Sequence, residues 1–466
     1  MSSFPEGFVW GVSTAAYQIE GAVHEGGRGP SIWDTYSHTP GKVMRGDTGD
    51  VACDHYHRLE EDLDLLKAIG AQVYRFSIAW PRIQPTGKGP ANAAGIAFYD
   101  RLIDGLIARG IKPVPTLYHW DLPQALEDEG GWANRAIIDW FADYARIVFD
   151  AFGDRVDMWT TINEPWVACY LGYALDIHAP GRADQAAAAA AHHHLLLAHA
   201  AAVEVSRRSH RQAKVGIALN LMHIYPTSEH RDDVAAAALA DSQLNKSFLQ
   251  PLFAHGYPQD LAWLTDRLQE GGALVRPGDL DRIATPIDFL SINSYHPRYV
   301  CAPARLTETR AAGFDGGYVS PFAFGLPIAD VVPATIARTA MGWPVEPDGF
   351  RDLLIRLSND YPYVPLYISE NGFSAADYAD QQGTVKDPER IAYLASHLRA
   401  AQEAIAAGVD LRGYWIWSFL DNFEWAFGYG QRFGLVYVDY PTGRRTPKTS
   451  FGWVRDLFAA NRLPAL

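Results

Sequence analysis

Eight short apolar runs alternate with longer amphipathic stretches along almost the whole chain, and this alternation constrains the fold more than any other feature. The runs are rich in β-branched and aromatic residues, as buried strands are. They cover residues 8–13, 73–78, 112–117, 156–161, 215–220, 289–293, 366–369 and 413–417. The amphipathic stretches predict helices over 59–69, 96–109, 134–152, 185–210, 349–360, 388–407 and 449–461. Eight strand–helix units predict an α/β (β/α)8 TIM barrel with extended βα loops.

A doubly wound sheet is the competing architecture for alternating strands and helices. It would place a G-x-G-x-x-G turn after the first strand. The chain has none there, and Gly428, Gly430 and Gly434 are wrongly spaced and follow the last strand. No linker-like segment divides the chain, so we expect one catalytic barrel domain over 1–466. We interpret 301–340, rich in Gly and Pro, as a long loop after the sixth strand.

Composition excludes several classes of function. The net charge of −14 argues against nucleic acid or an anionic membrane as partner. Cys53, Cys169 and Cys301 lack the spacing of a disulfide framework or a zinc site. The histidines at 192–194 and 199 include no i, i+4 pair, so a helix face is the better interpretation than a metal site. The first residues do not resemble a secretory signal, and no apolar run is long enough to span a bilayer, so we expect a cytoplasmic protein.

Two carboxylates stand directly after predicted strands. Glu164 lies in the motif TINEP (161–165), and Glu370 in ISENG (368–372). A charged carboxylate at the end of a buried strand is costly, because burial disfavours the charge. In a barrel both strand ends face one pocket. Paired carboxylates facing one substrate are typical of glycosidic bond hydrolysis.

The other predicted strands also end in polar or aromatic side chains. One such residue is unremarkable, since a lone His119 is more often a satisfied core histidine. Eight strand ends of this kind indicate a shared site. The residues are Gln18 and Glu20, Arg75, His119 and Trp120, Asn163, Asn220, Asn293 and Tyr295, and Trp417, Glu424 and Trp425.

These motifs, in this order, make the chain resemble glycoside hydrolase family 1, the β-glucosidase family, over essentially its whole length. The resemblance rests on the two glutamate motifs and on FVWG (8–11), AAYQIEG (15–21), YRFS (74–77), LYHWDLP (117–123) and WIWSFLDNFEW (415–425). The family fold is the (β/α)8 barrel, which agrees with the strand count. The family needs no metal or organic cofactor, and we expect none.

The resemblance implies a retaining double displacement. Glu370 would be the nucleophile, and Glu164 the acid that becomes the base. Arg75 and Tyr295 would keep Glu370 ionised and oriented. Retention predicts carboxyl groups about 5–5.5 Å apart, against roughly 6.5–9.5 Å for inversion.

The resemblance also implies two groups of substrate contacts. Residues for the sugar would be Gln18, His119, Trp120, Asn163, Asn293, Trp417, Glu424, Trp425 and Phe433. Candidates for the aglycone entrance are Cys169, Leu171, Asn220, Trp343 and one of Phe322 and Phe324.

The expected substrate is a small β-glycoside or oligosaccharide with a terminal non-reducing β-D-glucosyl residue, with galactosides or fucosides tolerated. A 6-phospho-β-glycosidase is the nearest alternative, but Glu424 stands where a phosphate would bring like charge. An inactive sugar-binding protein on the same fold is a second alternative, and a transglycosidase is a third. The sequence leaves the natural aglycone and the oligomeric state open, a homo-oligomer included.

Overall fold

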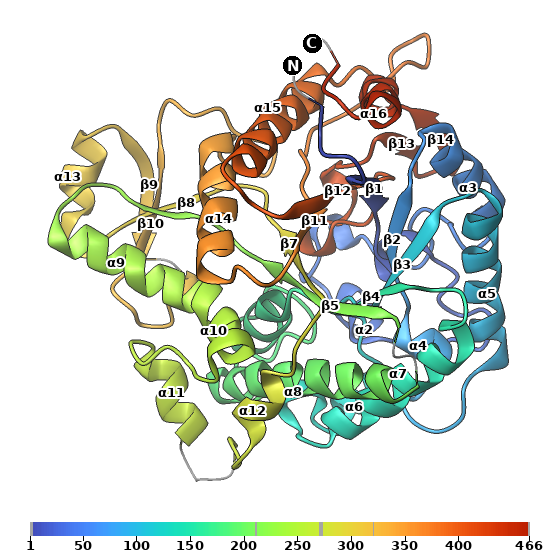
Figure 1. Cartoon of the computed structure of the whole chain (residues 1–466), viewed down its shortest axis with the longest axis horizontal. Coiled ribbons are helices and arrows are strands. Elements are labelled where there is room, and N and C mark those ends of the chain that lie inside the picture. Colours follow the sequence, from blue (N-terminus) through green and yellow to red (C-terminus); the bar gives the residue numbers. More distant parts are fainter. Residues whose placement is uncertain (1–2, 210–211, 270–273, 320, 465–466) are drawn as a thin grey trace.

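Eight parallel strands close into a barrel (Figure 1). The computed structural model describes residues 3–209, 212–269, 274–319 and 321–464. Around the barrel the strands follow the order β1-β12-β11-β7-β5-β4-β3-β2. They are β1 (Val9–Ser13), β2 (Val73–Ser77), β3 (Lys112–Tyr118), β4 (Met158–Asn163), β5 (Lys214–Asn220), β7 (Phe289–Asn293), β11 (Leu366–Glu370) and β12 (Leu411–Trp417). The predicted (β/α)8 barrel is confirmed, and each predicted strand overlaps an observed one.

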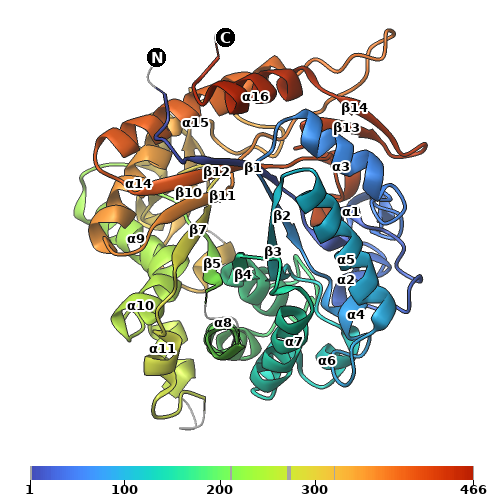
Figure 2. The same ribbon diagram turned by 45° about the vertical axis from the view of Figure 1, so that its right-hand side comes forward.

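The long helices lie outside the barrel, as Figure 2 shows for α5, α7 and α8 beside β2, β3 and β4. In α7, Ile137, Phe141, Tyr144 and Val148 are buried at spacings of three and four residues, so one face packs inward. The helices that the periodicity predicted are α3 (Leu59–Ala68), α5 (Ala93–Ala108), α7 (Ile137–Phe152), α8 (Gln185–Ser209), α14 (Pro347–Asp360), α15 (Pro388–Ala406) and α16 (Thr449–Ala460). The predicted end of α8 at His210 lies outside the described residues.

Shorter helices occupy the loops between these units. They are α1 (Ala16–Ile19), α2 (Ile32–Ser37), α4 (Trp80–Ile83), α6 (Gln124–Asp128), α9 (Arg231–Asp241), α10 (Ser247–Ala254), α11 (Ala262–Gln269), α12 (Asp279–Ile283) and α13 (Leu306–Ala311). A π-helix, η3 (Val167–Ala174), follows β4 directly. Within the described ranges, no helix is both long and apolar enough to cross a membrane.

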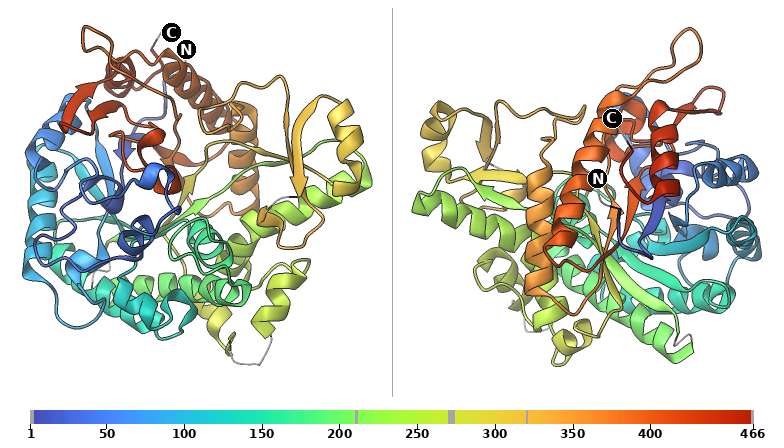
Figure 3. Two further views of the ribbon diagram at one scale, coloured as in Figure 1. Left: turned by 180° about the vertical axis from the view of Figure 1, so that it is seen from behind. Right: turned by 45° about the horizontal axis from the view of Figure 1, so that its top comes forward.

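The interpretation of 301–340 as a long loop is wrong, because the segment contains strands and helices. The segment contributes to a four-stranded sheet of β6 (Ile224–Pro226), β8 (Arg298–Cys301), β10 (Ala329–Pro333) and β9 (Phe314–Val319), in that order. It lies to one side of the barrel with α9 and α13 (Figures 1 and 3). Arg298 on β8 pairs with Asp330 on β10, with Nη2 2.9 Å from Oδ2. Gly and Pro conceal the strand pattern, and the pairing joins segments that are distant in sequence.

A second small sheet lies near the end of the chain. It is a two-stranded antiparallel ribbon of β13 (Val436–Asp439) and β14 (Arg444–Pro447). The ribbon leads directly into α16, and Figure 1 shows both beside the chain termini. It places the residues after β14 next to the loops that follow β11 and β12.

Aromatic side chains fill the barrel interior toward its N-terminal end. Phe289, Tyr367 and Trp415 form one buried cluster with valines from β2 and β3, and only the interior brings these strands together. Phe289 lies over Gly216 of the neighbouring β5. A Cβ on Gly216 would stand 2.6 Å from Cε2 of Phe289 and 2.4 Å from its carbonyl oxygen. The glycine makes room for the ring, and packing this tight has no space for an added methyl group.

We therefore predict that Gly216→Ala lowers the free energy of unfolding by about 1–3 kcal/mol, the usual cost of overpacking a core. Gly452→Ala is the matched control, because a Cβ on Gly452 in α16 meets nothing within 4 Å. That change should stabilise by up to about 1 kcal/mol through helix propensity. Denaturant unfolding followed by circular dichroism measures both. Equal midpoints for the two variants would contradict the proposed packing.

Candidate active site

The C-terminal ends of four barrel strands bring predicted catalytic and sugar-binding residues together. Arg75 lies in β2, Glu164 follows β4, Asn293 ends β7 and Glu370 ends β11. Parallel strands in a closed barrel all end on one face, so these side chains meet although they are far apart in the chain. Glu164 and Glu370 are only 6% and 4% exposed, so both carboxyl groups are largely removed from bulk solvent.

The Glu370 carboxylate is held from both sides. Arg75 Nη1 contacts its Oε1, and the Tyr295 hydroxyl donates to its Oε2 at 2.8 Å. Burial raises the pKa of Glu370 above its usual range, and the charge and hydrogen bond of Arg75 and the hydroxyl of Tyr295 limit this rise. These contacts compensate the charged form of a buried carboxylate. They also fix which oxygen faces which partner.

Glu164 has a different environment. Its backbone is left-handed, with φ 45°, and its N–H donates to the carbonyl of Ala218 at 2.8 Å. Asn293 Nδ2 donates to Oε1 at 2.6 Å. Burial and, as a second cause, the charge of Glu370 raise the pKa of Glu164 to about 8. The two environments differ: Arg75 and Tyr295 favour the charged form of Glu370, whereas burial and the neighbouring charge favour the protonated form of Glu164.

A series of hydrogen-bonded polar side chains lies beside the two carboxyl groups. Asn163 Oδ1 accepts from Arg75 Nη2 at 2.5 Å and from Asn293 Nδ2 at 2.9 Å. Its amide nitrogen lies 3.1 Å from His119 Nε2, so that ring nitrogen accepts. Burial, and then the charge of Arg75, lowers the pKa of His119 well below its usual range. A neutral ring that accepts at Nε2 carries its proton on Nδ1, which is buried without a hydrogen-bond partner among the described residues.

Gln18 and Glu424 form a second polar wall. Gln18 Nε2 donates to the carbonyl of Phe423 at 2.9 Å and to Glu424 Oε2 at 3.4 Å. Its Oε1 is buried and has no partner within the part of the chain that the structure describes. Burial raises the pKa of Glu424 to about 8, with the charge of Glu370 as a second cause. A donor at His119 and an acceptor at Gln18 suit hydroxyl groups, which both donate and accept.

Aromatic rings complete the site. The His119 ring lies nearly parallel to Trp417 and to Trp425, at 17° and 18°, with centroids 6.0 Å away in each case. Trp120 packs against Trp425 at 4.6 Å and donates from Nε1 to the carbonyl of Asn163 at 2.9 Å. Phe433 packs edge-on against Tyr295 at 5.9 Å. Flat rings beside hydrogen-bonding groups provide the two surfaces that a sugar needs, one for its C–H face and one for its hydroxyls.

Backbone strain concentrates at these residues. Trp120 has φ 77° and Trp425 has φ 48°, in addition to the left-handed Glu164. Side chains of this size rarely adopt the left-handed region, and such strain is retained where the surrounding structure enforces it. Three strained residues within one site indicate that side-chain placement there outweighs local backbone preference.

The candidates for the aglycone entrance are more scattered. Trp343 packs on Tyr295 with centroids 5.2 Å apart, and Asn220 pairs with Asn293 in the β5–β7 register. Leu171 is half-buried on η3, whereas Cys169 on the same helix is fully buried. Phe322 contacts Trp166 and Phe324 contacts Tyr170, at 5.8 and 5.3 Å. The segment between β9 and β10 thus packs against the helical segment that follows Glu164.

Some residues that support the site were given no role in the sequence analysis. Ser369 donates to Asn293 Oδ1 at 2.6 Å, and the Tyr393 hydroxyl donates to the carbonyl of Tyr295 at 2.6 Å. Asn371 Nδ2 donates to the carbonyl of Ser294 at 2.7 Å. Ser369 and Asn371 flank Glu370 in its motif, which was an available signal. Tyr393 lies on α15, and nothing in the sequence links it to β7.

Two other groups lie apart from the site. Glu20 pairs with Arg82 at 3.1 Å and accepts from Tyr99 at 2.7 Å, so its contacts are structural. The histidines of α8 are buried and packed, with His193 Nε2 2.9 Å from Asp279. Among the described residues, no group of three or more His, Cys, Asp or Glu side chains could hold a metal ion.

Comparison with known proteins agrees with this geometry. The family model described as glycosyl hydrolase family 1 matches residues 1–463. The chain is 49% identical to thermostable β-glucosidase B of Thermobispora bispora, covering 99% of this chain and 92% of that one. It is 44% identical to β-glucosidase A of Thermotoga maritima, covering 99% of each. A solved structure of the T. maritima β-glucosidase in complex with deoxynojirimycin superimposes with a TM-score of 0.90, at 43% identity over the full length of both chains.

The TIM barrel, the two buried carboxyl groups at its strand ends and the full-length similarity to β-glucosidases identify a glycoside hydrolase. The chain belongs to glycosyl hydrolase family 1.

The environments of the two carboxyl groups predict a bell-shaped pH dependence of kcat/KM. Activity should fall as pH rises through the pKa of Glu164, at about 8, because the acid is then lost. It should fall at low pH as Glu370 becomes protonated. Tyr295→Phe removes a hydrogen bond that lowers the pKa of Glu370, so the acid limb should move to higher pH. Tyr367 lies on β11, as Glu370 does, but belongs to the interior cluster, so Tyr367→Phe should leave both limbs unchanged. An unmoved acid limb in Tyr295→Phe would contradict the role of Tyr295.

Proposed function

We propose that this protein is a retaining β-glucosidase. It releases terminal non-reducing β-D-glucosyl residues from β-glucosides and short oligosaccharides. The observation that carries the proposal is the division between Glu370, held by Arg75 and Tyr295, and Glu164, whose raised pKa keeps it protonated. The names of its relatives, β-glucosidase A and β-glucosidase B, support the choice of sugar.

In the first step Glu370 attacks the anomeric carbon. The bond from its carboxylate oxygen to this carbon forms as the glycosidic C–O bond breaks. Glu164 donates its proton to the departing oxygen, so the aglycone leaves as a neutral alcohol. The Arg75 guanidinium keeps the nucleophile ionised until attack. The product is a glycosyl ester on Glu370 with inverted configuration.

In the second step Glu164 acts as a base. Once Glu370 is esterified its negative charge is gone, and with it one of the causes that raise the pKa of Glu164. Glu164 is then a better carboxylate. It accepts a proton from water as the water oxygen bonds to the anomeric carbon and the ester bond breaks. The second inversion restores the β configuration and regenerates both groups.

The sugar lies among the polar walls described above. His119 Nδ1 donates to one hydroxyl and Gln18 Oε1 accepts from another, which gives both buried atoms a partner. Asn163, tied to Arg75 and Asn293, is placed to reach the 2-hydroxyl, whose hydrogen bonds strengthen in the transition state. Glu424 serves two neighbouring hydroxyls. Trp417 provides a stacking surface.

An unphosphorylated sugar is favoured over a 6-phosphoglycoside. Glu424 accepts from the neutral amide of Gln18, and no Arg or Lys is described among its hydrogen-bond partners. A phosphate there would meet an ionised carboxylate above pH 8, and a neutral carboxyl group without a compensating cation below it. Galactosides and fucosides remain compatible with the amide and carboxyl contacts.

Proton NMR of a 4-nitrophenyl β-D-glucoside reaction tests the proposal. We expect the first sugar released to be β-glucose, with α-glucose appearing only by later mutarotation. Early α-glucose would overturn the retaining mechanism. No release from the glucoside, with rapid release from the 6-phosphoglucoside, would establish the alternative substrate. No release from either would favour a binding protein.

Glu164→Ala should discriminate between leaving groups. An alkyl glucoside needs protonation of its leaving oxygen, whereas a 2,4-dinitrophenyl glucoside does not. We expect kcat/KM for the alkyl substrate to fall by about 100–10,000-fold, the usual contribution of general acid catalysis, with a much smaller loss for the activated one. Glu370→Ala is the contrasting variant and should lose both reactions. Equal losses in Glu164→Ala would contradict its role as the acid.

A further inference from the structure

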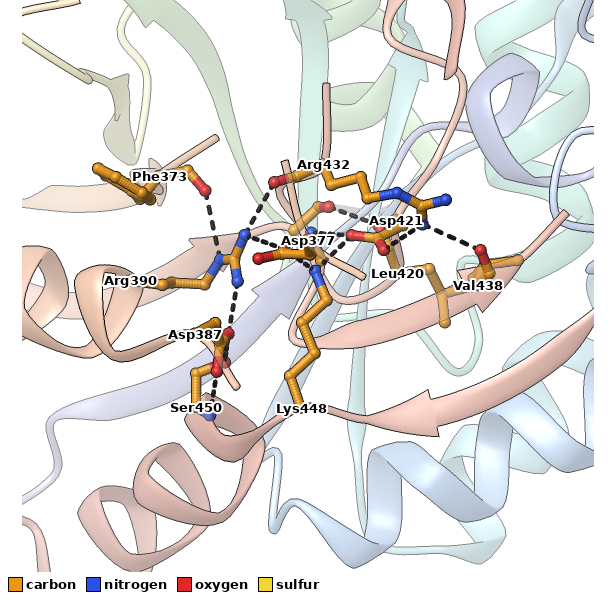
Figure 4. A network of polar contacts seen from close by, with 12 residues as sticks. Phe373, Asp377, Asp387, Arg390, Leu420, Asp421, Arg432, Val438, Lys448 and Ser450 are labelled. Carbon is orange, nitrogen blue, oxygen red and sulfur yellow. Dashed lines mark hydrogen bonds and ion pairs between the residues drawn. The ribbon is translucent and has the colours of Figure 1, made fainter. Parts of the chain in front are cut away.

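A buried network of ion pairs joins the loops that follow β11 and β12 (Figure 4). It contains three acids and three bases, so its formal charges balance. They are Asp377, Asp387, Arg390, Asp421, Arg432 and Lys448. None of the proposed catalytic steps uses these residues. They nevertheless connect two loops near the sugar site. The loop after β11 begins next to Glu370 and is called the Glu370 loop; the loop after β12 contains Glu424 and is called the Glu424 loop.

Lys448 joins these two loops. It stands between β14 and α16 in the sequence, and its side chain is fully buried. Its Nζ lies 2.5 Å from Asp377 Oδ2 and 2.6 Å from Asp421 Oδ1. Asp377 belongs to the loop after β11, and Asp421 to the loop after β12. Two buried carboxylates repel each other. The ammonium group between them attracts both and so compensates this repulsion.

Asp421 links Lys448 to the residues next to the proposed sugar site. It stands three residues before Glu424, and its other oxygen accepts from Arg432 Nη1 at 2.7 Å. Its Oδ1 also accepts from the N–H of Gly434 at 2.9 Å. The chain at Gly434 lies so close that a Cβ there would stand 2.0 Å from the Asp421 nitrogen. Asp421 therefore fixes Glu424 on one side and Phe433, next to Gly434, on the other.

Asp377 links Lys448 to the residues that follow Glu370. Its Oδ2 also accepts from Arg390 Nη2 at 2.6 Å. Arg390 in turn donates to the carbonyl of Phe373 at 3.3 Å and to that of Arg432 at 2.8 Å. Phe373 stands three residues after Glu370. The loop that follows the nucleophile is thus bound to the same buried cations as the loop that leads to Glu424.

We propose that Lys448 is a positioning residue for the glucosyl site: its ammonium group sets the spacing between the Glu370 loop and the Glu424 loop. The inference deepens the proposed function and rests on it for the identity of the sugar. Removing the charge leaves Asp377 and Asp421 facing each other with one uncompensated negative charge. The loops then separate, and Glu424 and Phe433 move relative to Glu370.

Lys448→Met tests this, because methionine keeps the apolar stem and removes the charge. A shift of about 1 Å at a reacting centre costs on the order of 100-fold, so we expect kcat/KM for 4-nitrophenyl β-glucoside to fall by roughly 10–100-fold. Arg445→Met is the matched control. Arg445 is also buried on β14 and is paired at 2.8 Å, but with Asp62 of α3 on the outside of the barrel. The control should lose thermal stability to a similar degree and keep kcat/KM within about threefold, since no site loop moves.

A second measurement separates positioning from general destabilisation. Monodeoxy β-glucosides show which hydroxyl Glu424 holds: removal of that hydroxyl costs nothing further in Glu424→Ala, which has no side-chain hydrogen-bonding group. In Lys448→Met the same hydroxyl should contribute less to kcat/KM than in the wild type, while the other hydroxyls keep their contributions. Uniform loss over all deoxy substrates, or equal losses in Lys448→Met and Arg445→Met, would overturn the proposal. If Lys448→Met does not fold, Asp377→Asn releases one loop only and should show the same selective effect.

Calorimetric binding of deoxynojirimycin makes the outcome independent of turnover. Lys448→Met should bind it about tenfold or more weakly than the wild type and the Arg445→Met control do. A wild type that binds the inhibitor but does not hydrolyse glucosides would overturn the proposed function and leave the positioning role standing. Unchanged affinity in Lys448→Met would overturn the positioning role alone. A wild type that neither binds nor hydrolyses would overturn both.

Discussion

A carboxylate at the end of a buried strand is stable only if the structure compensates its charge, and the contact between Arg75 and Glu370 supplies that compensation. Arg75 on β2 reaches Glu370 at the end of β11, and β1 and β12 separate these two strands around the barrel. The contact therefore exists only when the barrel is closed. It also orders the rest of the site. Arg75 holds Asn163, Asn163 holds His119, and the charge that Arg75 stabilises on Glu370 raises the pKa of Glu164.

The barrel divides packing and chemistry between its two ends. Toward the N-terminal end, rings of Phe289, Tyr367 and Trp415 fill the interior, with glycines on neighbouring strands making room for them. Toward the C-terminal end, the same strands present acids, amides and strained backbone. The strain at Glu164 and the burial of several ionisable groups are costly in isolation. A tightly packed interior is what allows the other end to keep them in place.

Much of this could be predicted from the sequence, because the signals were local. Strand and helix periodicity predicted the eight barrel strands and the main helices. The motifs around Glu164 and Glu370 predicted which carboxyl groups would matter. The small side sheet was missed because β8 and β10 are short and adjoin or contain Pro, β9 contains two glycines, and β8 and β10 are joined by a pair distant in sequence, Arg298 with Asp330. Tyr393 was missed for the same reason, since its partner Tyr295 belongs to another element.

The sequence by itself determined the order of elements, the residue types at each strand end and the family resemblance, because periodicity and motif spacing are properties of neighbouring residues. Only the tertiary structure decided which of those residues touch. Arg75 and Glu370 are 295 residues apart in the chain. Lys448, Asp377 and Asp421 lie in three separate segments and meet only in the folded protein. Electrostatic effects depend on distance and burial. The different environments of Glu164 and Glu370, and the burial of Lys448 between Asp377 and Asp421, are therefore products of the closed barrel and its loops.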